Sequence, residues 1–80
     1  MDIKVYTIPS SPWCVKVMDW IKKKKLPFQE LDISESDTYR DDLLHKTSQI
    51  GVPVVEVDDI IVIGYNEQKL QDAIDKAMSK

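Results

Sequence analysis

The chain has 80 residues, of which 42% are hydrophobic and 31% charged, a balance typical of one soluble globular domain spanning residues 1–80. Its 11 basic and 14 acidic side chains give a net charge of −3, which argues against nucleic-acid binding because that function needs a basic surface. No apolar run reaches transmembrane length, the first residues lack a signal-peptide pattern, and the single cysteine excludes an internal disulfide, so we expect a cytoplasmic monomer without membrane contact.

A strand and a helix are predicted first. Residues 2–8 are rich in β-branched and aromatic side chains, which is typical of a strand. Ser11 is a favourable N-cap and Pro12 suits the first helical position, so a helix should begin here. It is expected to continue to about Lys25 and to end before Pro27. Its buried face should consist of the apolar residues at helical spacing, which are Cys14, Val17, Met18 and Ile21.

The middle of the chain predicts one more strand and one more helix. Residues 28–33 form a short apolar and alternating segment, typical of a strand. Serine and aspartate residues within positions 34–37 offer several N-caps for a helix that ends near Thr47. We expect Tyr39 and Leu43 to lie on one face of this helix.

The last third of the chain predicts a hairpin followed by a helix. Residues 52–57 and 60–63 are strand-like, and the two aspartates between them form a two-residue turn. Asn66 is expected to cap the final helix. One apolar stripe of this helix should face the core, comprising Leu70, Ala73, Ile74, Ala77 and Met78.

The resulting order is β-α-β-α-β-β-α. A helix connects the first two strands, so they should be parallel, whereas the tight turn makes the last two antiparallel. A mixed four-stranded sheet with three helices on its two faces is therefore the expected α/β architecture.

The segment that joins the first strand to the first helix carries a recognisable motif. Residues 6–14 read Tyr-Thr-Ile-Pro-Ser-Ser-Pro-Trp-Cys, and this segment resembles the active-site loop of glutaredoxins, which carries Cys-Pro-aromatic-Cys. The chain matches at Pro12, Trp13 and Cys14, but Ser11 stands at the first cysteine position. The resemblance covers essentially the whole chain and includes Gly-Val-Pro at residues 51–53. It implies a thioredoxin-like fold and a thiol–disulfide oxidoreductase.

Position 11 has the physical setting that an attacking sulfur needs. Unpaired amides and the helix dipole at a helix N-terminus lower a thiol pKa from about 8.5 to between roughly 3.5 and 7.5. A serine hydroxyl stays protonated in that place and forms no stable bond to sulfur. We therefore interpret Ser11 as a replacement of the nucleophilic cysteine or selenocysteine, which leaves the chain inactive or strongly impaired. In the alternative interpretation Ser11 is natural, and the chain is a non-catalytic module that binds a peptide or glutathione.

The resemblance also implies roles for residues around position 11. Cys14 would be the resolving thiol, Trp13 a wall of the binding groove, and Pro53 a proline with a cis peptide bond. Backbone groups of Val52 would pair with an extended peptide. At the start of the last helix, the backbone amides of Asn66 and Glu67 would bind the γ-glutamyl carboxylate of glutathione. Gln49, in the loop before the third strand, would be a further polar contact.

Glutathione is expected to act as co-substrate, with protein disulfides or glutathione mixed disulfides as the other substrates. We expect no permanently bound cofactor and no metal, because one cysteine and one histidine fall short of a ligand set. Two departures from the family pattern are compatible with an electron donor other than glutathione. Ile8 stands where many glutaredoxins carry a lysine, and Gly64-Tyr65 replaces a Gly-Gly step. A redoxin reduced by thioredoxin reductase is therefore the second hypothesis.

Overall fold

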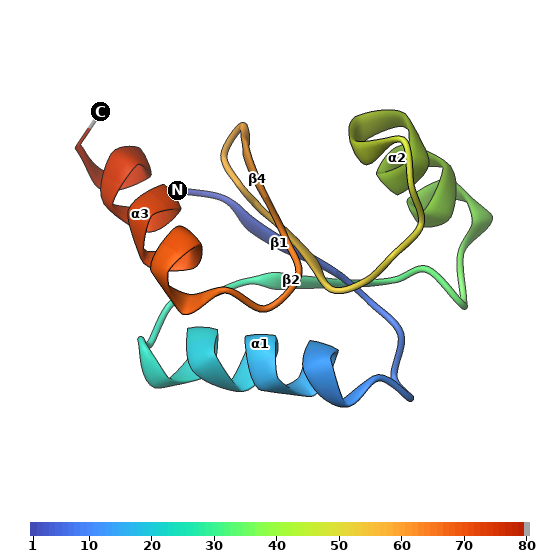
Figure 1. The fold of residues 1–80 in the computed structure, drawn as a ribbon, viewed down its shortest axis with the longest axis horizontal. Helices are drawn as coiled ribbons and strands as arrows, with labels where there is room; N and C mark the ends of the chain where they lie inside the picture. Colours follow the sequence, from blue (N-terminus) through green and yellow to red (C-terminus); the bar gives the residue numbers. More distant parts are fainter. Residues whose placement is uncertain (80) are drawn as a thin grey trace.

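The computed structural model describes residues 1–79, with four strands and three helices in the predicted order (Figure 1). The elements are β1 (Ile3–Thr7), α1 (Pro12–Lys23), β2 (Gln29–Asp32), α2 (Asp37–Thr47), β3 (Val54–Val57), β4 (Ile60–Ile63) and α3 (Glu67–Met78). Within residues 1–79, no helix combines the length and the apolar character needed to cross a membrane.

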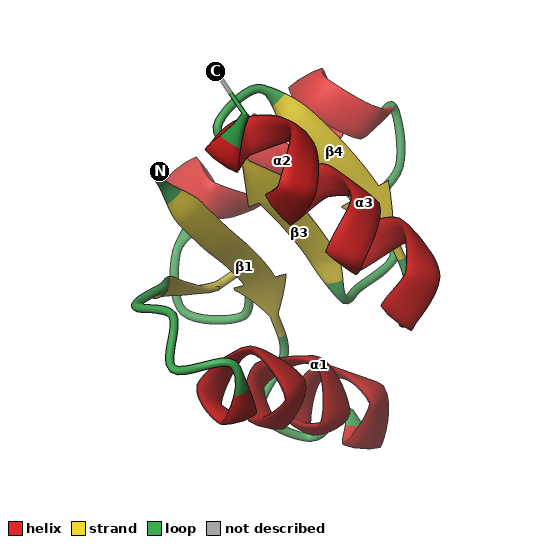
Figure 2. Ribbon diagram, turned by 90° about the vertical axis from the view of Figure 1, so that its left-hand side faces the viewer, coloured by secondary structure: helices red, strands yellow, loops and turns green. Residues whose placement is uncertain are grey.

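The strands form one mixed sheet in the order β2-β1-β3-β4. β1 and β2 are parallel, as expected of two strands that a helix connects, whereas β3 is antiparallel to both β1 and β4. Figure 2 shows β1, β3 and β4 side by side. Val5 lies opposite Val55 and Tyr6 opposite Val54, so these pairs point to alternate faces of the sheet. The predicted thioredoxin-like α/β architecture is confirmed.

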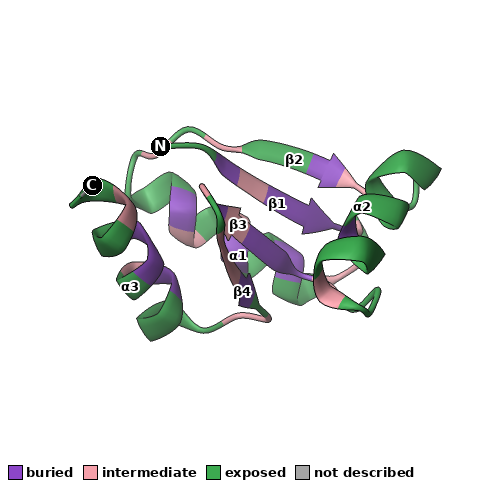
Figure 3. Cartoon of the chain, turned by 90° about the horizontal axis from the view of Figure 1, so that it is seen from above, coloured by how far each residue is buried: buried purple, intermediate pink, exposed green. Residues whose placement is uncertain are grey.

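The larger core lies between the sheet and the pair of helices α1 and α3. In Figure 3 the inner sides of these helices are buried, while their outer sides are exposed. Apolar residues recur at helical spacing on both helices and alternate along the strands, which brings them together in one layer. The buried members of this cluster are Ile3, Val5, Val17, Ile21, Val55, Val57, Val62, Leu70, Ala73 and Ile74.

The opposite face of the sheet packs against α2 in a smaller core. α2 contributes a single buried residue, Leu43, because most of its side chains are polar. Tyr39 lies four residues before Leu43 and therefore on the same face of α2, as predicted, but it is 36% exposed. The buried residues of this second cluster are Tyr6, Leu31, Ile33, Leu43 and Val54.

The C-terminal ends of α1 and α3 each differ from the prediction in one respect. α1 ends at Lys23 rather than Lys25, because Lys25 adopts the left-handed conformation (φ 59°), which no α-helix can continue. Met78, the last residue of α3, is 68% exposed, so it does not belong to the buried part of the apolar stripe.

A polar clasp joins the end of α2 to the sheet. The Lys46 ammonium donates to the Tyr6 hydroxyl (3.0 Å) and to a Glu56 carboxylate oxygen (2.9 Å). Tyr6 is 1% exposed, so this bond supplies the polar partner that a buried phenol requires. The hydrogen bonds to Tyr6 and Glu56 raise the pKa of Lys46 above its ordinary value.

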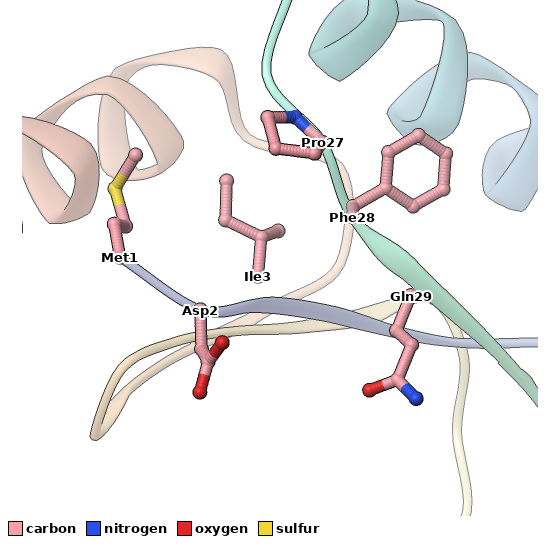
Figure 4. Close-up of a pocket in the computed structure, with 6 residues that line it drawn as sticks. All are labelled: Met1, Asp2, Ile3, Pro27, Phe28 and Gln29. Carbon is pink, nitrogen blue, oxygen red and sulfur yellow. The ribbon is translucent and has the colours of Figure 1, made fainter.

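A shallow hollow of about 260 Å³ lies between the starts of β1 and β2. Figure 4 shows the side chains of Met1, Ile3 and Pro27 on one side of β1, and those of Asp2 and Gln29 on the other. The hollow is at the beginning of β1, whereas Ser11 follows the end of that strand. It therefore belongs to the opposite end of the sheet from the glutaredoxin-like loop.

Candidate functional site

The start of α1 follows β1 through a tight turn. The Ser11 N–H donates to the Ile8 carbonyl (3.0 Å), and the Ser11 carbonyl accepts from the Val15 N–H (3.3 Å). Ser11 has the extended backbone of an N-cap (φ −90°, ψ 118°), and Pro12 follows it. Its hydroxyl makes no capping hydrogen bond, however, so the helix is started by backbone geometry and proline rather than by the expected side-chain cap.

The N-terminus of α1 differs from those of the other two helices in residues 1–79. Ser36 and Asn66 cap α2 and α3 with side-chain hydrogen bonds, and each of these helices has an acidic residue in its first turn. α1 has neither a side-chain cap nor a first-turn acid. Its first-turn amides and the positive end of its dipole are therefore left without an acidic or capping side chain beside residue 11.

Cys14 lies in the first turn of α1 and is fully buried. It is a free thiol on the same side of the helix as Val17 and Ile21, the side that packs against the sheet. Ser11, three residues earlier, is partly exposed. The site thus has an accessible position 11 followed by a sheltered thiol.

The peptide bond between Val52 and Pro53 is cis, as the resemblance implied. Pro53 lacks an N–H group for the sheet, so β3 begins at Val54 and not at Val52 as the sequence predicted. Tyr6 pairs with Val54, so the same register brings Pro53 opposite Thr7 at the end of β1. The glutaredoxin-like loop that leads to Ser11, called the redox loop below, begins at this end of the strand. The Pro53 carbonyl accepts from the Gly64 N–H (2.8 Å), which brings the β4–α3 connection to the same end of the sheet.

Trp13 and Tyr65 connect the starts of α1 and α3. Their ring centroids are 6.1 Å apart with an interplanar angle of 36°. Trp13 is 54% exposed, and the Lys16 ammonium lies 4.6 Å from its ring centroid. Sequence reasoning named Tyr65 only as a departure from Gly-Gly; its contact with Trp13 depends on how the helices pack, which no local pattern signals.

The start of α3 is held by its own side chains. The Asn66 side chain accepts from the Lys69 N–H (3.0 Å), which confirms Asn66 as the cap. The Tyr65 hydroxyl donates to Glu67 (2.9 Å), and this hydrogen bond, with partial desolvation and the nearby negative charge, raises the pKa of Tyr65. A carboxylate bound at this helix terminus would therefore meet the negative charge of Glu67.

Gln49 and Val52 belong to the loop between α2 and β3. Gln49 is exposed, and its backbone N–H and carbonyl both bond to the Thr47 hydroxyl. Val52 is partly buried against the smaller core. The structure directly joins Trp13 to Glu67 through Tyr65, while Gln49 is bonded to Thr47 rather than to another proposed site residue.

Thr7 ends β1 beneath this site and was missed by sequence reasoning. The residue is fully buried, and its hydroxyl has no hydrogen-bond partner among residues 1–79. Buried hydroxyls are normally paired, so this group carries an uncompensated desolvation cost. Within the same residues, no cluster of three or more histidine, cysteine or acidic side chains is arranged to hold a metal.

Over most of its length the chain is similar to glutaredoxin-like proteins. The family model described as Glutaredoxin matches residues 3–62. A protein of Clostridium pasteurianum, described as an uncharacterized glutaredoxin-like 8.6 kDa protein in the rubredoxin operon, is 31% identical over 74 residues, which cover 92% of this chain and 99% of that protein.

Two further proteins are similar to this chain. N-acetyl-S-hydroxy-L-cysteine reductase of Bacillus subtilis is 35% identical over 57 residues, which cover 71% of this chain and 61% of the reductase. The crystal structure of the thioredoxin-like protein BC3987 superimposes with a TM-score of 0.84 and 32% identity, covering 90% of this chain and 99% of that one.

Proposed function

The chain belongs to the glutaredoxin family, and on this premise we propose that residue 11 is the attacking position of a glutathione-linked thiol–disulfide exchange site. Membership of the family indicates a thiol–disulfide oxidoreductase in general terms. In this chain Ser11 replaces the cysteine or selenocysteine that attacks, so the protein with serine is inactive or strongly impaired.

The uncapped start of α1 is the observation that carries this proposal. α2 and α3 use a side-chain cap and a first-turn acid, whereas α1 has neither. A thiolate at residue 11 would accept the first-turn amide hydrogen bonds and gain from the helix dipole, so its pKa would fall. The same effect stabilises this sulfur as a leaving group when it is displaced from a mixed disulfide.

The exchange balances in two steps once position 11 carries a thiolate. The thiolate attacks the glutathione sulfur of R–S–S–glutathione, forms a disulfide to glutathione, and releases R–S⁻, which takes a proton from water. A second glutathione thiolate then attacks this disulfide, giving glutathione disulfide and restoring the thiolate. With a protein disulfide as substrate, Cys14 loses its proton and resolves the mixed disulfide, and two glutathione molecules reduce the resulting bond.

Glutathione would lie across the end of the sheet where the redox loop, the cis-proline and α3 meet. Val52 would offer backbone groups to the peptide, Trp13 would form a wall, and the amides of Asn66 and Glu67 would receive the γ-glutamyl carboxylate. The exposure of Trp13 and Gln49 supports this arrangement, because both side chains are accessible from solvent.

The similarity to the Bacillus reductase supports a related substrate class. That protein is described as reducing N-acetyl-S-hydroxy-L-cysteine, a small cysteine derivative with oxidised sulfur. Small oxidised cysteine derivatives therefore join glutathione mixed disulfides as candidate substrates of this chain.

Thioredoxin reductase is the second candidate electron donor. The carboxylate of Glu67, bonded to the Tyr65 hydroxyl, puts negative charge at the proposed seat of the glutathione carboxylate. Ile8, in the turn before Ser11, supplies no positive charge for the other carboxylate of glutathione. The missing positive charge at residue 8 weakens glutathione binding and favours thioredoxin reductase, whereas Glu67 opposes the carboxylate of the γ-glutamyl group but not its ammonium.

Restoring the attacking sulfur tests the proposal. The Ser11→Cys variant should reduce a glutathione mixed disulfide of a small thiol, in an assay coupled to glutathione reductase. Ser11→Ala, which also changes only the side chain at this position, should remain as inert as the parent. Replacing glutathione and its reductase by thioredoxin reductase then identifies the donor.

Each outcome has a defined meaning. Activity of Ser11→Cys with glutathione supports the leading proposal, and activity only with thioredoxin reductase supports the second donor. If Ser11→Cys is inert with both, the enzymatic interpretation fails. A non-catalytic binding module then becomes the better account.

A further inference from the structure

A groove of about 350 Å³ lies between α1 and the start of α3. Its volume falls near the lower end of the range of small-molecule sites, roughly 300–1,000 Å³. Four lining residues recur along one face of α1 at helical spacing, and two lie where α3 begins. The lining residues are Lys16, Asp19, Trp20, Lys23, Tyr65 and Glu67.

The groove brings together opposite charges that do not pair with one another. Within residues 1–79, Lys16, Asp19 and Lys23 form no ion pair or side-chain hydrogen bond, although their spacing of three and four residues permits such pairs. Among the same residues, the Glu67 carboxylate accepts a hydrogen bond only from the Tyr65 hydroxyl. The two ammonium and two carboxylate groups are thus available to a ligand.

Two aromatic side chains give the groove firm walls. Trp20 and Tyr65 are both partly buried and pack against the larger core. Tyr65 is further held by its contact with Trp13 and by its bond to Glu67. Aromatic faces of this kind can cover an apolar stem and attract an ammonium group.

We propose that this groove binds the zwitterionic amino-acid group of a small molecule. Its carboxylate would bind the lysine ammonium groups, and its α-ammonium would bind Asp19 and Glu67. Because the four charged side chains sum to zero, a simple anion meets two carboxylates and a simple cation meets two lysines. Only a ligand with both charges satisfies both sets.

The groove is connected to position 11 through Trp13. Lys16, at one end of the groove, stacks on Trp13, and Tyr65 contacts the same ring. Trp13 is two residues from Ser11, so the end of the groove formed by Lys16 is the end nearer to position 11 along α1. This step rests on the proposed function, under which the expected ligands of the groove are amino-acid thiols and disulfides.

An unreactive probe separates binding from chemistry. S-methyl-L-cysteine is a zwitterion without a free thiol, and it can be titrated into the isotope-labelled parent chain while amide and indole NMR signals are followed. We expect saturable shifts at the groove residues, including the Trp20 indole. N-acetyl-S-methyl-L-cysteine, which lacks the ammonium, and S-methyl-L-cysteine methyl ester, which lacks the carboxylate, should both bind more weakly.

Charge-removing variants identify the groove as the site. Asp19→Asn and Lys16→Gln should each weaken binding by about two- to fivefold, as expected for a partly exposed charge contact. Lys22→Gln is the matched control, because Lys22 lies on α1 but does not line the groove. Its affinity should equal that of the parent.

Three results would overturn the proposal: no shift at groove residues, equal affinity for all three probes, or equal weakening by Lys22→Gln. None of them bears on thiol chemistry at position 11, because neither the probe nor Ser11 can exchange disulfides. Conversely, an inert Ser11→Cys variant with intact zwitterion binding would reject the redox function and retain the groove.

Discussion

The ring of Trp13 lies 6.1 Å from the ring of Tyr65, and this contact joins the start of α1 to the start of α3. Tyr65 in turn donates its hydroxyl hydrogen to Glu67. Trp13, which follows Pro12, is therefore linked through Tyr65 to the start of α3. A substrate carboxylate is proposed to bind at this helix terminus.

Removing the charge of Glu67 should lower the pKa of Tyr65. The carboxylate accepts the phenolic hydrogen and so favours the protonated form, which holds the pKa of Tyr65 above its ordinary value of about 10. We expect Glu67→Gln to bring this pKa back towards the ordinary value in a tyrosinate absorbance titration. Asp72→Asn, which removes a charge elsewhere on α3, should leave it unchanged.

Replacing Thr7 by valine should stabilise the protein by about 1 kcal/mol. Valine keeps the shape and the β-branched character of threonine, and it removes a fully buried hydroxyl that has no partner among residues 1–79. Thr7→Ser keeps the hydroxyl and loses a methyl group, so it should destabilise. Urea denaturation of both variants measures the difference, and a Thr7→Val variant less stable than the parent would show that the hydroxyl is satisfied.

The clasp formed by Lys46 should contribute stability that is lost at alkaline pH. Lys46→Met leaves the buried Tyr6 hydroxyl without its donor and should cost about 1 kcal/mol at neutral pH. The pKa of Lys46 is raised on folding, so its contribution is complete below the unfolded value near 10.5 and disappears as pH rises through the higher folded value.

Denaturation at neutral and strongly alkaline pH measures this difference. The gap in stability between parent and Lys46→Met should narrow at the alkaline end. A gap that stays constant through the lysine titration would exclude an ionic origin.

Leu43 is the single buried residue of α2, so Leu43→Ala should loosen the whole helix. Deleting a fully buried leucine side chain costs about 3 kcal/mol. Leu44→Ala is the matched control on the same helix, because Leu44 is 47% exposed. Thermal unfolding should therefore shift strongly for the first variant and little for the second.

The order of elements and the redox loop could be predicted because they depend on local signals. Proline, the hairpin aspartates and helical spacing mark their own places in the sequence, and the cis bond at Pro53 followed from the resemblance. Periodicity placed Tyr39 and Leu43 on one face of α2, but it could not show that so polar a helix buries only Leu43.

Tertiary contacts account for the features that the sequence did not predict. Lys46 meets Tyr6 across 40 positions of the chain, and Trp13 meets Tyr65 only because two helices cover the same face of the sheet. The unpaired Thr7 hydroxyl likewise depends on everything packed around it.

The pKa of the thiol in Ser11→Cys tests the central claim most directly. It can be measured from the pH dependence of alkylation, with the buried Cys14 as an internal reference in the parent chain. The uncapped start of α1 predicts a thiol pKa below about 7.5. A value near the ordinary 8.5 or above would show that this helix terminus does not stabilise an anion, and would contradict the assignment of residue 11 as the attacking position.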